Sequence, residues 1–146
     1  MLESSRYFFL AGALPFVLLG LAHGLATPLA LGDRKGLSPR DPDLAGVMAR
    51  SFPRLTSRTD MWRAWVGFNL SHSLGALAFG AFVLIVGRSA GSYGEQAGLV
   101  VPFASCVSMA YLGLAARYWF RIPILGCALS LGSFLASWAL LALGGP

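Results

Sequence analysis

The sequence predicts an all-α integral membrane protein, a four-helix bundle with a short amphipathic helix in its first loop. The chain has 146 residues, of which 56% are hydrophobic and 12% charged, whereas soluble domains carry about 25% charged residues. Its mean hydropathy is +0.68. Four apolar runs, at residues 7–31, 61–86, 98–119 and 123–143, are each long enough to cross a bilayer, which takes about 20 helical residues. The length is that of a single domain.

The first apolar run, residues 7–31, contains no Asp, Glu, Lys or Arg, and His23 is its only histidine. A cleaved signal peptide is the alternative to a membrane span, because Arg6 supplies a small basic segment just before the run. However, the run is longer than the apolar region of an ordinary signal peptide, and no small-residue cleavage site follows it. We therefore expect a membrane span.

The only long polar segment is the loop at residues 32–60. Asp41-Pro42 resembles a helix start, with aspartate as the N-cap and proline at the first helical position. Apolar residues then recur at helical spacing until Pro53 ends the pattern; they are Leu44, Val47, Met48 and Phe52. We expect a short amphipathic helix that lies on the membrane surface or caps the bundle. The alternative is a solvated loop.

Local signals predict where the other spans begin and end. Ser57-Arg-Thr-Asp60 resembles a capping box that opens the second span. The Gly/Ser-rich stretch at 88–98 predicts a loop before the third span, and residues 117–121 predict a tight basic-aromatic turn before Pro123 opens the fourth. Four spans place both termini on one side of the membrane.

Basic residues predict the orientation of these spans. All eleven Lys and Arg residues except Arg6 and Arg88 lie on the side of the 32–60 loop and the 117–121 turn. Cytoplasmic loops carry an excess of Lys and Arg. We therefore expect a multi-pass protein of the bacterial inner membrane, with loop 32–60 in the cytoplasm and both termini outside. Arg6, directly before the first span, favours the opposite orientation.

The net charge of +5 alone would suit nucleic-acid binding, but the basic residues flank the predicted spans, where orientation and lipid head groups require them. We therefore exclude nucleic acid and expect the lipid bilayer as a partner. Five residues near one interface are candidates for clamping an anionic lipid head group: Arg63, Arg117, Arg121, Trp62 and Trp119. The favoured alternative is that they fix the topology and snorkel to the interface.

Both histidines lie within predicted spans. His23 and His72 are at depths of roughly 12 and 15 Å from the same membrane face, at 1.5 Å per helical residue. Since the first two spans run antiparallel, the two imidazoles can meet. One interpretation is a cofactor site in which they ligate haem b or a metal ion, as in a redox protein. The favoured alternative is that each hydrogen-bonds a neighbouring helix, with Asn69 as the partner.

A third interpretation is a small-molecule carrier or membrane enzyme. Its pocket would be lined by Trp65, Asn69 and His72, with His72 as general acid or base. No Asp or Glu lies within any of the four predicted spans. This argues against a carboxylate-driven transporter and leaves the imidazole without a carboxylate to orient it. We therefore assign no catalytic residue.

Small residues recur every four positions on several spans. Such spacing allows helix backbones to approach closely within lipid. Examples are Gly20-x-x-x-Gly24 on the first span and Gly67-x-x-x-Ser71-x-x-x-Gly75 on the second. We expect these stripes to serve packing within the bundle rather than a dimer interface.

The string Trp62-x-x-Trp65-x-Gly-Phe-Asn69-x-Ser-His72-Ser-x-Gly resembles a signature of small uncharacterised bacterial four-span membrane proteins. Their first span also carries a His-Gly pair, as at His23-Gly24. The resemblance implies the four-span layout and brings no activity, substrate or cofactor. With little mass outside the spans, many small-residue stripes and no acids in the spans, we expect a structural or accessory subunit that packs against a larger membrane complex or lipid.

Overall fold

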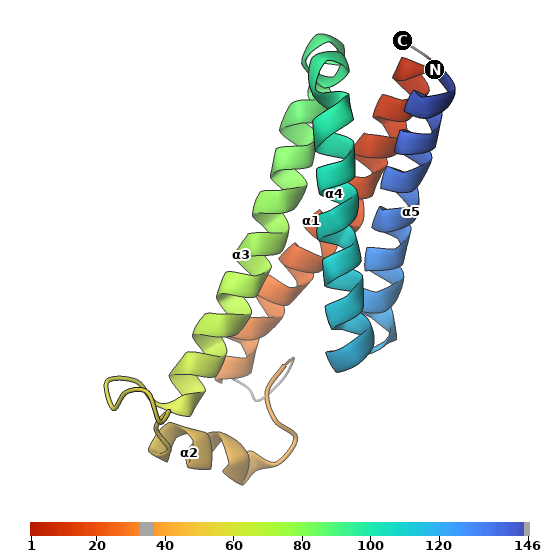
Figure 1. Ribbon diagram of the computed structural model, residues 1–146. Coiled ribbons are helices and arrows are strands. Elements are labelled where there is room, and N and C mark those ends of the chain that lie inside the picture. The colour runs from red at the N-terminus through yellow and green to blue at the C-terminus, as the bar shows by residue number, and fades with distance from the viewer. Residues whose placement is uncertain (33–36, 145–146) are drawn as a thin grey trace. The chain divides into compact units, whose positions relative to one another are not determined.

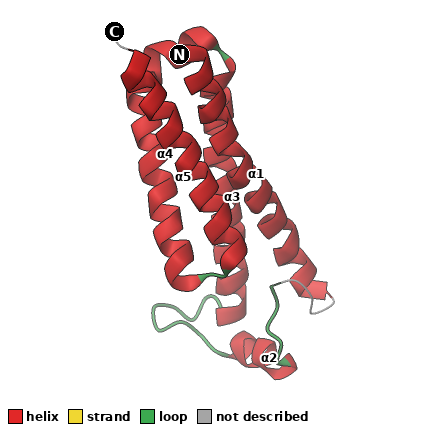
Figure 2. Ribbon diagram, turned by 90° about the vertical axis from the view of Figure 1, so that its right-hand side faces the viewer, coloured by secondary structure: helices red, strands yellow, loops and turns green. Residues whose placement is uncertain are grey.

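The computed structural model describes residues 1–32 and 37–144, and these form five helices. They are α1 (Leu2–Gly32), α2 (Pro42–Arg50), α3 (Met61–Arg88), α4 (Ala90–Tyr118) and α5 (Arg121–Gly144) (Figure 1). The described residues contain no strand (Figure 2). Four helices are long and apolar enough to cross a membrane. The all-α fold class is confirmed, and the chain is a multi-pass membrane protein. The charged residues of the first loop at 33–35 lie outside the described residues.

The chain divides into two compact units. The first comprises Met1–Leu19 with Ala76–Pro146, and the second comprises Gly20–Gly75. Both α1 and α3 contribute one part to each unit.

The first unit is a four-helix bundle whose core is aromatic. Phe134 of α5 is fully buried, and its ring lies 5.6 Å from that of Phe9 on α1 and 6.2 Å from that of Phe79 on α3. Gly12 makes room for it, because a Cβ there would lie 2.5 Å from the Phe134 ring. Edge-to-face packing of Phe16 on Phe79, at 4.7 Å, extends the core along α1.

A cluster of three fully buried hydroxyl groups joins three helices of the first unit. Ser5 of α1 lies 2.6 Å from the Tyr93 hydroxyl of α4 and donates to the Ser137 carbonyl of α5 at 2.9 Å. The Tyr93 and Ser137 hydroxyls are 2.9 Å apart. Buried polar groups are costly in hydrocarbon unless they are bonded. Their mutual bonding therefore fixes the register of α1, α4 and α5.

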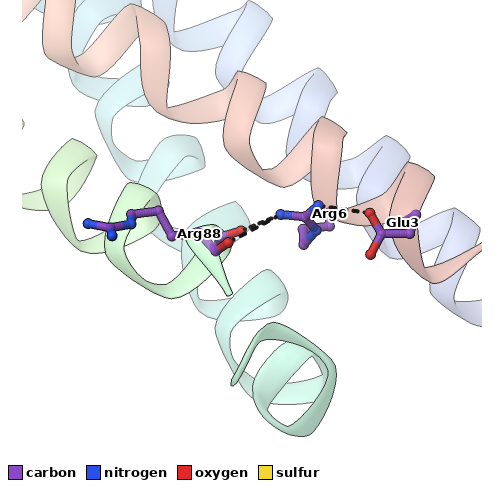
Figure 3. Close-up of polar contacts among 4 residues, drawn as sticks. Glu3, Arg6 and Arg88 are labelled. Carbon is purple, nitrogen blue, oxygen red and sulfur yellow. Dashed lines mark hydrogen bonds and ion pairs between the residues drawn. The ribbon is translucent and has the colours of Figure 1, made fainter. Parts of the chain in front are cut away.

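Arg6 bonds the C-terminal end of α3 (Figure 3). Its guanidinium donates to the carbonyls of Gly87 and Arg88, at 3.1 and 3.4 Å, and pairs with Glu3 at 2.8 Å. A helix end leaves carbonyls without intrahelical partners and carries partial negative charge, so a cation is stabilising there. Helix α1 begins at Leu2, ahead of the predicted span start at residue 7, and this places the arginine on its first turns.

The predicted loop at 88–98 is wrong, because α4 begins at Ala90. The Ser89 side chain accepts from the backbone N–H of Ser92 at 3.3 Å and caps the helix. Tyr93 and Ala97 belong to the buried core. Tertiary packing of these two residues outweighs the weak helix propensity of the Gly and Ser residues around them.

In the second unit, the short amphipathic helix predicted in the first loop is confirmed as α2. Asp41 is the N-cap and Pro42 the first helical residue. The predicted capping box at Ser57 is wrong: α3 begins three residues later than it implies, and Asp60 accepts from the backbone N–H of Arg63 at 2.8 Å. The backbone N–H of Met61, the first residue of α3, donates to the Ser51 carbonyl at 2.8 Å.

Candidate functional site

In the second unit, α1 and α3 make a close polar contact. The Ser73 hydroxyl of α3 donates to the carbonyl of Gly20 on α1 at 2.6 Å. A Cβ at Gly24, one turn further along α1, would lie 2.5 Å from the same hydroxyl. The predicted use of the Gly20–Gly24 stripe for packing within the chain is confirmed here. Gly24 allows the two backbones to approach, and Ser73 bonds them.

Next to this contact, three groups form a hydrogen-bonded chain. The Asn69 side-chain nitrogen donates to the Trp65 carbonyl at 2.7 Å, and its oxygen lies 2.9 Å from Nε2 of His23. An amide oxygen can only accept a hydrogen bond, so Nε2 of His23 carries the proton. In this way α3 sets both the orientation and the tautomer of a histidine on α1.

The two histidines meet, as their matched depths predict. The ring centroids of His23 and His72 are 5.3 Å apart and the ring planes lie at 64°. The Thr27 hydroxyl donates to the His23 carbonyl at 2.9 Å. Asn69 and Ser73 are buried within the seam. We call His23, Asn69, His72 and Ser73 the polar seam.

As they lie in this structure, the two imidazole rings are closer together than two axial ligands of one haem iron would be. Axial ligands on opposite faces of a haem iron would hold their ring centroids roughly 6 Å apart, because each nitrogen lies about 2 Å from the metal, and the macrocycle must fit between them. The observed separation is 5.3 Å. A single metal ion bonded to one nitrogen of each ring on the same side is compatible with it. In the described part of the chain, no third His, Cys, Asp or Glu completes such a site.

The predicted pocket residue Trp65 lies at the same end of α3. Its indole stacks on that of Trp62, with centroids 5.1 Å apart and planes at 16°. Its carbonyl accepts from Asn69. Both ends of the Asn69 amide therefore bond protein groups. The substrate pocket stays a prediction.

The predicted head-group residues fall in different units. Trp62 and Arg63 belong to the second, whereas Arg117, Trp119 and Arg121 belong to the first. Arg117 lies with its guanidinium carbon 5.4 Å from the Tyr118 ring centroid. A joint head-group clamp stays a prediction.

Sequence reasoning assigned no role to Ser73, the residue that bonds the two helices. Its spacing is the available signal, because it lies four residues after Asn69 and so shares its helix face. The hydroxyl cluster of Ser5, Tyr93 and Ser137 had no such signal. Its members are separated by 44 to 132 positions, and each is an ordinary residue in its own helix.

The small-residue stripe of α3 does not pack within the described residues. Gly67, Ser71 and Gly75 are exposed, and a Cβ added at Gly67 would meet nothing within 4 Å. The expectation that this stripe serves packing within the bundle is therefore wrong. The physical reason is that α3 uses the other face, with Asn69 and Ser73, to bond α1.

The resemblance of the Trp62–Gly75 string to small four-span membrane proteins stays a prediction. Comparisons with models of protein families, with curated proteins and with solved structures find no match for this chain.

Proposed function

We propose that this protein is a non-enzymatic accessory subunit whose α3 receives a transmembrane helix of a larger membrane complex. The observation that carries the proposal is the division of α3 into two faces. Asn69 and Ser73 bond α1, whereas Gly67 and Ser71 on the opposite face are exposed, and a Cβ added at Gly67 would meet nothing within 4 Å in the described residues. Positions 67 and 69 are roughly 200° apart around a helix.

The open face has the chemistry of a helix-packing surface. The Ser71 hydroxyl donates to the Phe68 carbonyl at 2.9 Å, so its polarity is satisfied within the helix. Phe68, with 74% of its surface exposed, and Leu74 border the small residues. Small residues between larger ones let a second backbone approach closely, where dispersion and Cα–H···O contacts favour association in lipid. Contact with lipid chains does not require a groove of small residues. A glycine within a helix also lowers helix stability by about 1 kcal/mol relative to alanine.

Gly67→Leu is expected to remove the partner without unfolding the protein. Filling the groove prevents close approach of a second helix, so we expect the amount of partner that co-purifies from native membranes after gentle solubilisation to fall at least about tenfold, which corresponds to 1.4 kcal/mol. The isolated protein should be as stable to heat as the unmodified chain, or more stable by up to about 1 kcal/mol, because a helical glycine is replaced. Gly113→Leu on α4 is the matched control, since a Cβ there also meets nothing within 4 Å.

Two outcomes would contradict the accessory role. The first is an unmodified chain that purifies as an isolated monomer from native membranes. The second is that a cross-linker attached at position 71 joins the chain only to another copy of itself. In the latter case the α3 face would be a homodimer interface.

A second candidate function is metal binding at the polar seam, favoured by the fixed tautomer of His23. Ligating histidines usually donate their other ring N–H to a carbonyl or carboxylate, which here would be the Asn69 amide oxygen. We expect stoichiometric metal in protein purified without chelators, lost in His72→Ala and weakened about 10- to 100-fold in Asn69→Leu. Elemental analysis of the purified protein measures the bound metal. Wild-type protein without metal would contradict metal binding at the polar seam.

We further propose that the chain resides in a bacterial inner membrane with the loop before α3 in the cytoplasm. The bonding of Arg6 to Glu3 and to the end of α3 supports this, because the main basic residue that opposes the orientation is engaged within the protein. A cysteine at Ser57 should react with an impermeant maleimide only after spheroplasts are lysed. Reaction in intact spheroplasts would reverse the orientation.

A further inference from the structure

We infer that α2 and the loop after it form an in-plane anchor that binds the anionic phospholipids of one leaflet. The anchor comprises residues 40–58. It lies wholly within the second unit.

The anchor lies where the chain enters the bilayer. The backbone N–H of Met61, the first residue of α3, donates to the carbonyl of Ser51 at 2.8 Å. This bond holds the end of α2 beside the start of a membrane-length helix. Within this unit α2 runs crosswise to α3, as both ribbon views show (Figures 1 and 2). If α3 crosses the membrane, α2 therefore runs along its surface.

The anchor exposes large apolar side chains. Leu44 and Val47 share one face of α2 and are about half exposed, and Phe52 and Leu55 follow the helix, with Leu55 96% exposed. Exposed apolar groups next to a bilayer gain free energy by entering the boundary between head groups and acyl chains. The anchor therefore offers four exposed apolar side chains to the membrane.

The charges of the anchor select the lipid. Its arginines are all exposed, and in the part of the chain that the structure describes none of them pairs with a carboxylate; they are Arg40, Arg50, Arg54 and Arg58. The negative charges of the anchor are Asp41, the N-cap of α2, and Asp43 in its first turn. Residues 40–58 therefore carry four positive and two negative charges. A net positive surface attracts an anionic leaflet.

The interleaving of charge and apolar bulk favours lipid over a protein partner. Arg54 directly precedes Leu55, and Arg50 precedes Phe52 by two positions. Guanidinium groups can snorkel to phosphates while neighbouring side chains enter the acyl boundary. A protein surface would have to bury both kinds of group in one contact.

The test uses the full chain with a fluorophore that reports polarity, attached at Leu55→Cys in a Cys106→Ser/Cys127→Ala background. The protein is reconstituted in phosphatidylcholine vesicles with or without phosphatidylglycerol, and the label is quenched either by lipid-borne spin labels or by aqueous iodide. We expect the anionic lipid to shift the label from iodide to lipid quenching. Each arginine near an anionic surface contributes on the order of fivefold. Arg50→Gln/Arg58→Gln should therefore reduce the inserted-to-exposed ratio roughly 25-fold.

The control Arg88→Gln/Arg117→Gln removes the same charge outside the anchor and should leave the ratio unchanged. An iodide-accessible label in both vesicle types would overturn the anchor. A lipid-quenched label indifferent to phosphatidylglycerol would overturn the choice of anionic lipid. A label shielded from both quenchers, with cross-links to protein, would show that a protein covers this surface instead.

Discussion

Gly24→Leu is expected to lower the free energy of unfolding by about 3 kcal/mol, near the upper end of the usual cost of overpacking. Even a Cβ at this position would lie 2.5 Å from the Ser73 hydroxyl. The larger side chain must therefore displace that hydroxyl from the Gly20 carbonyl or push α1 away from α3. Unfolding in mixed micelles of a mild detergent and dodecyl sulfate, followed by tryptophan fluorescence, measures the loss.

Gly67→Leu is the control for this prediction. It introduces the same side chain in the second unit, at a position where a Cβ meets nothing within 4 Å, and replacing a helical glycine is stabilising by up to about 1 kcal/mol. Equal losses in the two variants would mean that the polar seam does not hold α1 against α3.

Phe134→Ala should destabilise the first unit by about 2 kcal/mol. In water, truncating a buried phenylalanine costs about 3–5 kcal/mol, of which part is transfer from water and part is the cavity. Within lipid the transfer part is largely absent, because acyl chains are as apolar as the core. The cavity part remains, since Phe134 fills the space between Phe9 and Phe79 above Gly12.

The same micelle titration measures this loss, and Leu135→Ala provides the comparison. Leu135 is the next residue of α5 and is 47% exposed, so its truncation leaves no internal cavity and should change the unfolding midpoint little. A Phe134→Ala midpoint equal to that of Leu135→Ala would show that the aromatic core does not stabilise the first unit.

Periodicity and length were sufficient to predict the helices, and depth was sufficient to pair the histidines. His23 and His72 lie in antiparallel spans, so a fixed rise per residue brings them to one level. The start of α2 was predictable because Asp41-Pro42 is a local signal. Each of these inferences uses only neighbours in sequence or one rule of helix geometry.

The features that could not be predicted depend on contacts between segments that are distant in the sequence. The start of α4 depends on burial of Tyr93 and Ala97 in the core, which overrides local Gly and Ser content. The open face of α3 could not be identified, because the stripes containing Gly24 and Gly67 have the same spacing and only tertiary packing distinguishes them. The tautomer of His23 depends on how Asn69 is turned by the Trp65 carbonyl, and no sequence pattern encodes this.

The hydroxyl cluster has a consequence for biosynthesis. Ser137 follows Ser5 by 132 positions, so it leaves the ribosome roughly 7 to 26 seconds later at 5–20 residues per second. By the end of that interval α1, α3 and α4 have been made, and the Ser137 groups on α5 are the last members of the cluster to be added. Closure of the first unit is therefore the last step of its assembly. A chain stalled before α5 would leave Ser5 and Tyr93 without their Ser137 partner.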